Sequence, residues 1–486
     1  MKSRIILNAF EMTCVSHQAA GTWRHPDSQA VKYNDLEYWT NLAVLLEKGC
    51  FDAVFLADVV GVYDTYRGSA EVSLTDADQV PVNDPACQIS AMAAVTKHLG
   101  FGVTCSLTYE KPYLLARRYS TLDHLTKGRV AWNVVTSYLH SAAVNMGLDK
   151  AIPHDERYNL ADEFLDVTYK LWEGSWEDDA AVRDREQGVF ADASKVHPIN
   201  HKGKYFSVPG IHLCEPSPQR TPVIFQAGAS GRGREFAVKH AEGIFIQPGT
   251  VEQAREVVDD LSQRAAKYGR SRDKFKIFAL LTVITGESDE AAHQKFEDYL
   301  SYTSGEGMLS LYSGWTGVDF ANYDPDQPLE AVDNDNSIRA TLELLAKIDP
   351  VRKWTPRDII KYRSIGGLGP VLVGGPKKVA DELERWVDEG GVDGFNLAYA
   401  ITPGTFEDFI KYIVPELQRR GRVQTSYQGT TLRENLMGTN DPRVDENHPA
   451  AQYRGAYANA ESCKDHTRPS PYLGMHANVP ADVPAE

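Results

Sequence analysis

The residues best placed to do chemistry lie in the stretch 221–245, where a buried strand runs through a glycine-rich turn into a helix. The turn 228–233 offers backbone N–H groups at a helix start that we expect near Arg234, and its Ser230 adds a hydroxyl. Arg232 or Arg234 would add a full positive charge. These features predict a phosphate cradle, although an ordinary glycine-rich strand–helix loop would contain the same residues. The turn matches neither G-x-x-x-x-G-K-S/T nor a spaced G-x-G-x-x-G, so it does not indicate which nucleotide is bound.

A second pair of candidates is His154 and Tyr158, at the start of a predicted helix 154–172. Residues four apart lie on one face of a helix, about one turn from each other. Both rings can donate hydrogen bonds, and we expect their shared face to look across the site towards the cradle. The alternative is that the pair only caps the surface of the helix.

Polar side chains also lie at the carboxyl ends of three predicted strands. They are Asp58, Thr104, Asn133, Thr136 and Ser137. A buried residue of this kind is about as often a hydrogen-bond partner that holds a loop as it is a ligand contact. Several that point into the mouth of one barrel favour a ligand.

Other kinds of active site lack their signatures in this sequence. Neither H-E-x-x-H nor a Cys/His quartet is present, and the six cysteines form no C-x-x-C pair, so we predict no metal site. No G-x-S-x-G turn marks a nucleophile. A place for a phosphorylated ring cofactor, without a protein nucleophile, predicts that the cofactor carries out the difficult step.

These residues are positioned by a regular alternation of strands and helices. The predicted strands are 4–8, 52–58, 100–106, 129–135, 222–227, 242–246, 276–284 and 393–399. The predicted helices are 36–47, 85–98, 113–125, 154–172, 251–268, 376–389 and 405–419, with further helical pieces at 337–348 and 355–362. Eight strand–helix units predict a (β/α)8 TIM barrel of the α/β class, whereas a doubly wound sheet would more usually have about five to seven strands.

We assign residues 1–422 to this single barrel domain, with irregular insertions at about 173–219 and 300–369. The tail 423–486 is rich in Pro, Asn, Gly and Asp and has little periodicity. We interpret this tail as a C-terminal arm that wraps a neighbouring subunit or is partly disordered.

The composition is that of a soluble globular protein: 42% of the 486 residues are hydrophobic and 24% are charged, with no apolar run long enough for a membrane helix. The formal net charge of −16 disfavours a nucleic-acid partner, because the phosphate backbone rewards positive surface. The N-terminus lacks a secretory signal, and the cysteines are scattered. We therefore expect a cytoplasmic protein with free thiols.

Five short motifs occur in a characteristic order. They are GTWRH at 21–25, FDAVFLAD at 51–58, AWNVVTS at 131–137, HDERY at 154–158 and QAGAS at 226–230. In this combination the chain resembles the bacterial-luciferase-like flavin monooxygenases, within the subgroup of nitrilotriacetate monooxygenase component A and dibenzothiophene-sulfone monooxygenase. The resemblance covers about residues 1–435, and the tail beyond is the part least like the family.

The resemblance implies a TIM-barrel enzyme that takes reduced FMN, as diffusible FMNH₂, from a separate NADH-dependent FMN reductase and uses O₂ to oxidise a small molecule. By the family's pattern, the residues that contact FMN would be Asp58, Thr104, His154, Tyr158 and Ser230. The phosphate cradle would follow the fifth strand, whereas TIM barrels frequently hold phosphate after strands seven and eight. A homo-oligomer, either a dimer or a tetramer, is expected.

Two further stretches, within 8–18 and at 366–375, resemble members of the subgroup that oxidise methyl sulfides. We therefore predict oxidation of a small organosulfur compound, such as dimethyl sulfide, with cleavage of a C–S bond. The candidate pocket residues are Phe10, His17, Trp23, Arg24 and His25. The alternatives are a monooxygenase of an aminopolycarboxylate, an aryl sulfone or another carbon skeleton, and a barrel that binds flavin without catalysis.

Overall fold

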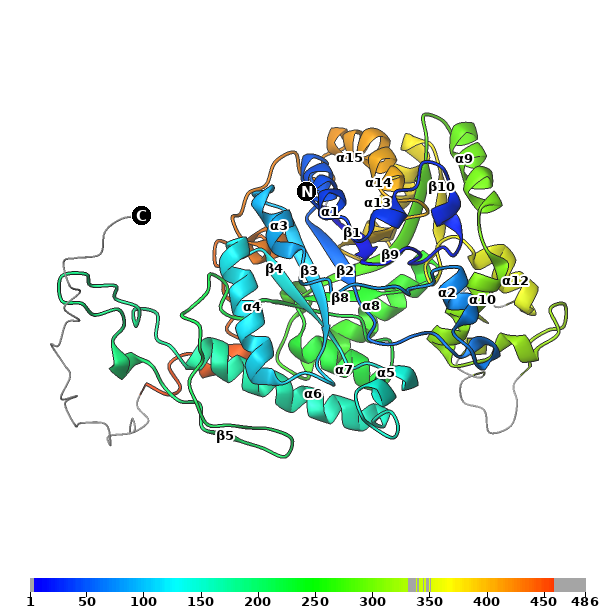
Figure 1. Cartoon of the computed structure of the whole chain (residues 1–486). Coiled ribbons are helices and arrows are strands. Elements are labelled where there is room, and N and C mark those ends of the chain that lie inside the picture. The colour runs from blue at the N-terminus through cyan, green and yellow to red at the C-terminus, as the bar shows by residue number, and fades with distance from the viewer. Residues whose placement is uncertain are drawn as a thin grey trace, which may run out of the picture.

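A single parallel sheet of nine strands forms the centre of the molecule, and all of these strands except β10 close into a barrel (Figure 1). The computed structural model describes residues 4–330, 338, 341–343, 345, 346, 349 and 351–458. The barrel strands are β1 (Ile6–Met12), β2 (Ala53–Ala57), β3 (Gly100–Ser106), β4 (Val130–Val135), β7 (Val223–Gln226), β8 (Gly243–Ile246), β9 (Lys276–Thr285) and β11 (Gly394–Ala398). β1 closes the ring by pairing in parallel with β11. The predicted (β/α)8 barrel is confirmed, with every predicted strand present.

An additional strand, β10 (Val371–Gly374), extends the sheet outside the barrel. The last part of β9, from Thr282 to Thr285, pairs with β10 beyond the barrel wall. A short antiparallel hairpin joins β5 (His201–Lys202) to β6 (Ser207–Val208). The two-residue strands β5 and β6 are too short for periodicity to predict them, and β10 lies just beyond the predicted insertion at about 300–369, where the sequence predicts no element.

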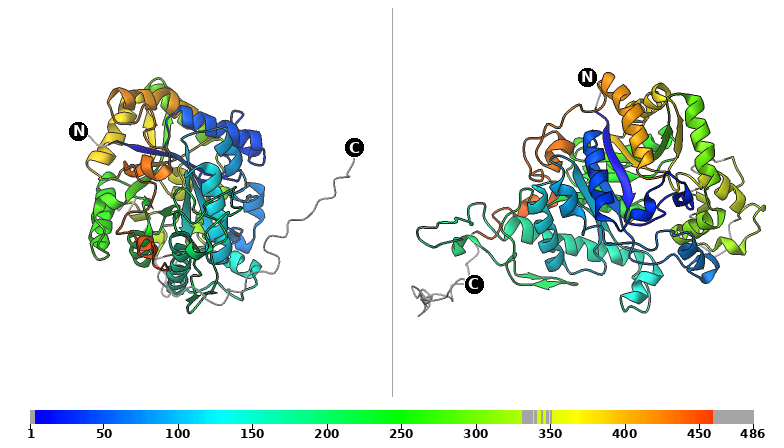
Figure 2. Two further views of the ribbon diagram at one scale, coloured as in Figure 1. Left: turned by 90° about the vertical axis from the view of Figure 1, so that its left-hand side faces the viewer. Right: turned by 45° about the horizontal axis from the view of Figure 1, so that its top comes forward.

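Helices cover the outside of the barrel between successive strands (Figures 1 and 2). The long ones are α1 (Leu36–Lys48), α4 (Pro112–Thr126), α6 (His154–Tyr169), α7 (Gly231–His240), α8 (Val251–Ala266) and α13 (Pro376–Asp388). The predicted helix 85–98 shortens to α3 (Ile89–Ala94). No helix within the described residues is long and apolar enough to cross a membrane.

The predicted helix 405–419 is divided by a π-helical turn into α14 (Gly404–Asp408) and α15 (Val414–Arg419). Pro415 lies in the first turn of α15. Because proline has no backbone N–H to bond the carbonyl four residues earlier, the regular α-helical pattern cannot continue through this position.

The second predicted insertion, at about 300–369, and the stretch before it contain more helix than the sequence suggests. α9 (Asp289–Ser301) precedes the insertion and leads to α10 (Gly305–Thr316) within it, and α12 (Pro356–Arg363) follows where a helix is expected. The apolar face of α10 packs with Tyr63 in a cluster of its own, apart from the main core around the barrel. The helix predicted at 337–348 lies largely outside the described residues.

Five phenylalanines fill the interior of the barrel: Phe10, Phe55, Phe225, Phe245 and Phe278. Phe55 stacks on Phe245 with ring centroids 4.3 Å apart, and Phe10 stacks on Phe55 at 5.2 Å. The inside of a TIM barrel is a packed core rather than a pore. A ligand must therefore bind beyond these rings, at the carboxyl ends of the strands.

The described part of the C-terminal segment, residues 423–458, packs against the barrel of its own chain. α16 (Leu432–Met437) places Leu432 among the apolar side chains at the amino-terminal ends of the strands. Arg433 is buried there and donates to both carboxylate oxygens of Glu242, at 2.7 and 2.8 Å. This segment therefore closes the end of the barrel opposite the carboxyl ends of the strands. The rest of the predicted arm lies outside the described residues.

Candidate active site

A cavity of about 540 Å³ opens at the carboxyl ends of β2, β4 and β7. It is lined by Asp58 after β2, by His154 and Tyr158 of α6, and by Ser230 before α7. The fold thus brings together four of the five side chains predicted to contact a cofactor. The fifth, Thr104, lines a smaller neighbouring cavity of about 130 Å³, whose wall also includes Asp58.

The turn after β7 presents the N-terminus of α7 to the larger cavity. Ser230 is the N-cap residue, and its Oγ accepts a hydrogen bond from the N–H of Gly233 at 3.0 Å. Because this cap starts the helix, α7 begins at Gly231, three residues before the predicted start. A Cβ added to Gly231 would meet no atom within 4 Å, so there is open space in front of the helix start. This arrangement fits a phosphate or another anion.

His154 and Tyr158 face this turn, as predicted. His154 Nε2 lies 3.2 Å from Ser230 Oγ, and the two rings meet edge to face with centroids 5.2 Å apart. A Cβ at Gly233 would lie 2.8 Å from the Tyr158 hydroxyl, so a glycine is needed for the helix start to approach the tyrosine. The start of α6 and the N-terminus of α7 therefore form one continuous wall of the cavity.

Arg232 and Arg234 do not charge the cradle, and the prediction that one of them does so is wrong. Arg232 Nη2 lies 2.7 Å from Asp162 Oδ2 on α6, and Arg234 Nη1 lies 2.8 Å from Asp260 Oδ2 on α8. Because α7 starts earlier than predicted, both side chains leave the helix towards neighbouring helices. Neither of them lines the larger cavity.

The cation that does line this cavity is Arg157, which the sequence analysis did not select. Its Nη1 donates to the carbonyl oxygen of Thr136 at 3.0 Å and to that of Ser137, just after β4. Burial lowers the pKa of Arg157 below its usual value, and no ion pair within the described chain balances its charge. The available signal was its position in the HDERY motif, between His154 and Tyr158.

Asp58 has a mostly buried carboxyl group at the mouth of the cavity. Burial, and to a lesser extent the charge of Asp84, raises the pKa of Asp58 to about 7. At neutral pH the group is therefore divided between acid and carboxylate, and can either donate or accept a hydrogen bond. Nearby, Thr104 Oγ1 accepts a hydrogen bond from Asn133 Nδ2 at 2.9 Å, which holds the threonine in place.

The five residues predicted to line a substrate pocket are Phe10, His17, Trp23, Arg24 and His25, and the fold does not bring them into one place. His17 packs edge-on against Phe10, with ring centroids 4.4 Å apart. Burial lowers the pKa of His17 to about 3, so its ring is neutral. Trp23 and Arg24 belong to a short 3-10 helix, and His25 follows it, with Nε2 3.0 Å from a carboxylate oxygen of α9. None of the five lines the larger cavity, and their role in substrate binding stays a prediction.

A hydrogen-bonded chain links the larger cavity to His17. Tyr138 lines the cavity, and its hydroxyl lies 3.1 Å from that of Tyr63. Tyr63 donates to Gln79 Oε1 at 3.0 Å, and Gln79 Nε2 donates to the backbone oxygen of His17 at 2.8 Å. Sequence reasoning missed Tyr63, Gln79 and Tyr138 because they lie outside the strands and helices that periodicity predicts.

The larger cavity fits a ring cofactor that ends in an anionic group. Its volume of about 540 Å³ is that of a small-molecule site. The α7 N-terminus, Ser230 and Arg157 supply donors and positive charge, while Asp58 offers a hydrogen-bonding group after a different strand, β2. Fold and cavity together define a TIM-barrel protein with a site suited to such a cofactor.

The chain belongs to the luciferase-like monooxygenase family, whose model matches residues 11–394. It is 69% identical to dimethyl-sulfide monooxygenase of Hyphomicrobium sulfonivorans, over 99% of this chain and 100% of that protein. It is 53% identical to long-chain alkane monooxygenase of Geobacillus thermodenitrificans, over 94% of this chain and 100% of that protein. The crystal structure of DmoA from Hyphomicrobium sulfonivorans matches 96% of this chain and 100% of its own, with a TM-score of 0.91. The protein is therefore a flavin-dependent monooxygenase, as the sequence predicts.

Proposed function

We propose that the protein is a two-component monooxygenase that uses FMNH₂ and O₂ to oxidise a methyl sulfide, such as dimethyl sulfide, with cleavage of a C–S bond. The observation that carries this proposal is the 69% identity, along nearly the whole chain, to a dimethyl-sulfide monooxygenase. A relative at 35% identity is named as component A of nitrilotriacetate monooxygenase, which supports a separate NADH-dependent FMN reductase as the source of FMNH₂. We place the reaction in the cytoplasm, where NADH is available.

In this proposal the FMN phosphate lies at the N-terminus of α7, held by Ser230 and the first N–H groups of the helix. Arg157 balances the negative charge, and His154 and Tyr158 form the wall beside the cofactor. Asp58 and Thr104 contact the ring, and Asp58 can hold or release a proton there because its pKa is about 7. Reduced flavin, when bound, supplies the electrons that activate O₂.

The cavity favours an uncharged substrate over an aminopolycarboxylate. Arg157 is the one Lys or Arg side chain in its described wall, and the apolar part of that wall includes Val59, Val134, Leu139 and Trp315. A substrate with several carboxylates would have to be buried without enough cations to balance it, which is costly. A small dialkyl sulfide needs only apolar contact.

The test is a product screen in which a generic NADH-dependent FMN reductase supplies FMNH₂. The compounds are dimethyl sulfide, dibenzothiophene sulfone, a long-chain alkane and nitrilotriacetate, and thiol release reports cleavage of the sulfide. We expect dimethyl sulfide to give product at least tenfold faster than the others. Faster oxidation of another compound would overturn the substrate assignment, and hydrogen peroxide as the only product from every compound would leave a flavin-binding barrel without catalysis.

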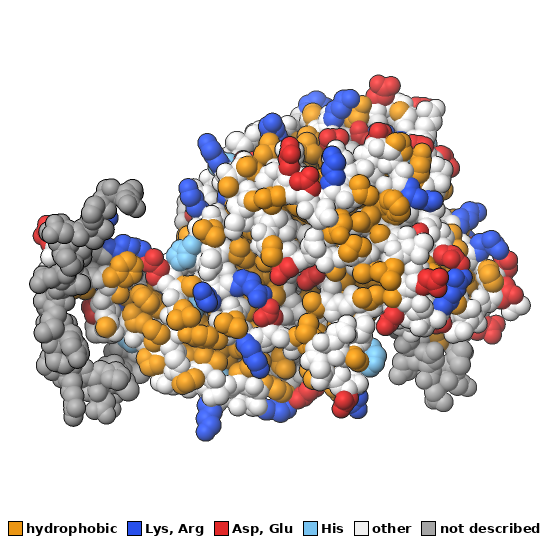
Figure 3. Space-filling model, in the orientation of Figure 1, with side chains coloured by type: hydrophobic (Ala, Val, Ile, Leu, Met, Phe, Trp, Pro, Cys, Tyr) orange, Lys and Arg blue, Asp and Glu red, His pale blue; other side chains and the backbone are white. Residues whose placement is uncertain are grey.

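We also propose that the chain forms a homo-oligomer, a dimer or tetramer, through the face that carries α4. Leu114 and Leu125 on α4 are 52% and 58% exposed, and Figure 3 shows hydrophobic side chains gathered over this face. Exposed apolar patches are typical of protein interfaces. Light scattering should show a lower mass for Leu125→Glu than for the wild type, and a monomeric wild type would overturn the proposal.

A further inference from the structure

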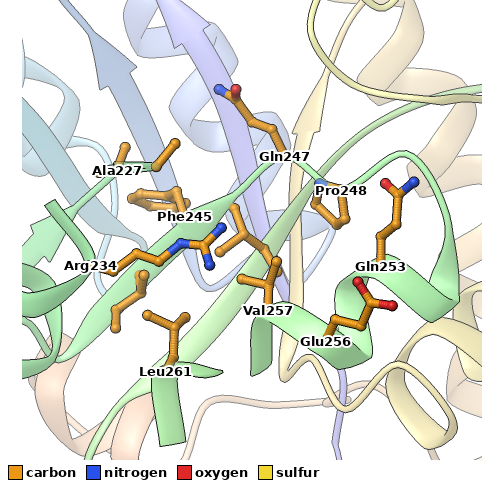
Figure 4. A pocket seen from close by; sticks show the side chains of 13 residues that line it. Ala227, Arg234, Phe245, Gln247, Pro248, Gln253, Glu256, Val257 and Leu261 are labelled. Atoms are coloured by element: carbon orange, nitrogen blue, oxygen red, sulfur yellow. The ribbon is translucent and has the colours of Figure 1, made fainter. Parts of the chain in front are cut away.

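A second cavity, of about 300 Å³, lies on the α8 side of the turn that follows β7 (Figure 4). We call it the rear cavity. Its walls come from that turn, from β8 with the residues after it, and from α7 and α8. Ala227, Gly228, Ala229 and Gln247 line both the rear cavity and the larger cavity. The turn is therefore a shared wall between two cavities.

The walls of the rear cavity are mainly apolar. Ile244, Phe245 and Ile246 belong to β8, and Val257 and Leu261 project from α8 beneath Phe245 in the view of Figure 4. Protein interiors are otherwise close-packed. A void of this size with mainly apolar walls leaves room for a ligand that buries apolar surface, which is favourable.

Two polar side chains at the rear cavity, Arg234 and Gln253, have partners within the protein. Arg234 Nη1 lies 2.8 Å from Asp260 Oδ2, so the charge of the guanidinium is balanced. Gln253 Oε1 accepts a hydrogen bond from the N–H of Gly249 at 2.9 Å. Glu256 is exposed at the rim. Among the described residues of this wall, no buried charge is therefore free to balance a charged ligand, whereas an uncharged apolar ligand leaves these pairs intact.

We propose that the rear cavity is a second binding site, which takes a small, uncharged, apolar molecule such as a dialkyl sulfide. A molecule packed against the rear of the turn restricts residues 227–229, which also form the wall of the larger cavity. Its occupancy therefore changes the affinity for flavin, and flavin changes its affinity by the same factor. Only this coupling rests on the proposed function, in that it places flavin in the larger cavity; the second site stands independently.

Crystals of the full chain pressurised with xenon test the site directly, because xenon enters dry apolar cavities. We expect xenon density beside Val257 and Phe245 in the wild type, and none in Val257→Trp or in the smaller filling variant Val257→Phe. Gln263→Trp adds a ring to the exposed face of the same helix and should keep the density. A wild-type rear cavity without xenon would overturn the proposal.

The coupling is tested by titrating FMN with and without diethyl sulfide. We expect diethyl sulfide to change the Kd for FMN at least threefold in the wild type and in Gln263→Trp, and to leave it unchanged in both Val257 variants. A change that persists in the filled variants would place the effect in the larger cavity and overturn the coupling. If the wild type binds no FMN, the proposed function fails, and the xenon result still decides the second site.

Discussion

Two turns of this chain share one pattern, an apolar strand followed by glycine and a helix start, and the structure uses them differently. After β7, the helix start capped by Ser230 opens to the larger cavity. After β10, the N–H of Gly375 donates to Asp289 Oδ1 at 2.7 Å, so a carboxylate of the chain itself occupies the start of α13. A Cβ at Gly375 would lie 3.1 Å from the Asp289 backbone, whereas one at Gly231 would meet no atom within 4 Å.

This difference shows that a glycine turn and a helix start are not sufficient for an anion site. The turn after β10 is followed by Lys377 and Lys378, so by sequence charge alone it is the better candidate. A cavity of about 610 Å³ lies at this turn as well, but the N–H of Gly375 is already bonded to Asp289, which α9, a helix absent from the sequence prediction, brings to it. For this reason we call the turn after β10 the closed turn, and the turn after β7 the open turn. A carboxylate of the chain that already accepts from a helix N-terminus weakens the attraction of that terminus for another anion.

The largest expected effect concerns the stability that the protein loses by burying the Asp58 carboxyl group in the wall of the larger cavity. Asp58→Asn should be more stable than the wild type, because burial raises the pKa of Asp58 from 3.8 to about 7. Between these pH values the Asp58 carboxyl group is ionised in the unfolded chain and protonated in the folded protein. The free energy of unfolding of the wild type therefore falls as the pH rises. The advantage of Asp58→Asn should grow from pH 4 to at most about 4 kcal/mol near pH 7 and then level off. Urea unfolding at several pH values measures it, and a difference independent of pH would contradict it.

The next effect concerns the two side chains of α6 that contact the open turn. His154→Ala and Tyr158→Phe should weaken FMNH₂ binding by about tenfold or more, ~1.4 kcal/mol, and should raise the hydrogen peroxide released per NADH, because water then reaches the reacting groups. Melting temperatures should change little. His293→Ala, on α9 near the closed turn, is the control and should alter neither quantity. Unchanged peroxide release in both variants would remove these two residues from the site.

Removing the cap hydroxyl tests the open turn itself. Ser230→Ala should weaken the binding of FMN by about 1–2 kcal/mol, the range for one charge-assisted hydrogen bond. Riboflavin lacks the phosphate and should bind both proteins equally, as measured by fluorescence titration. Equal losses of affinity for FMN and riboflavin would show that the phosphate of FMN lies elsewhere.

The smallest effect is expected at the closed turn, the turn after β10. Asp289→Ala removes the carboxylate that accepts from the N–H of Gly375, so this N–H becomes available to an anion from solution. Loss of the carboxylate should lower the free energy of unfolding by about 1 kcal/mol, as for other helix caps, and leave FMN affinity unchanged. Inorganic phosphate should then raise the melting temperature of the variant more than that of the wild type at equal ionic strength. Equal responses to phosphate would show that Asp289 does not keep anions from this helix.

Most of the barrel could be predicted because each of its strands and long helices carries its own periodicity. α10 escaped prediction because its sequence, GEGMLSLYSGWT, is rich in glycine and serine, which have low helix propensity. It forms a helix because Ser304 caps it and its side chains are buried in a cluster with Tyr63. Burial against distant parts of the chain here outweighs local preference.

By itself, the sequence determined the barrel, the order of its strands, and the meeting of His154 and Tyr158 with the turn after β7. These follow from local periodicity and from the rule that carboxyl ends of barrel strands share one face. Only the tertiary structure decided that Arg157, rather than Arg234, lines the cavity, and that the turn before α13 is closed by Asp289. The physical reason is that both outcomes depend on contacts between residues far apart in the chain, which no local pattern encodes.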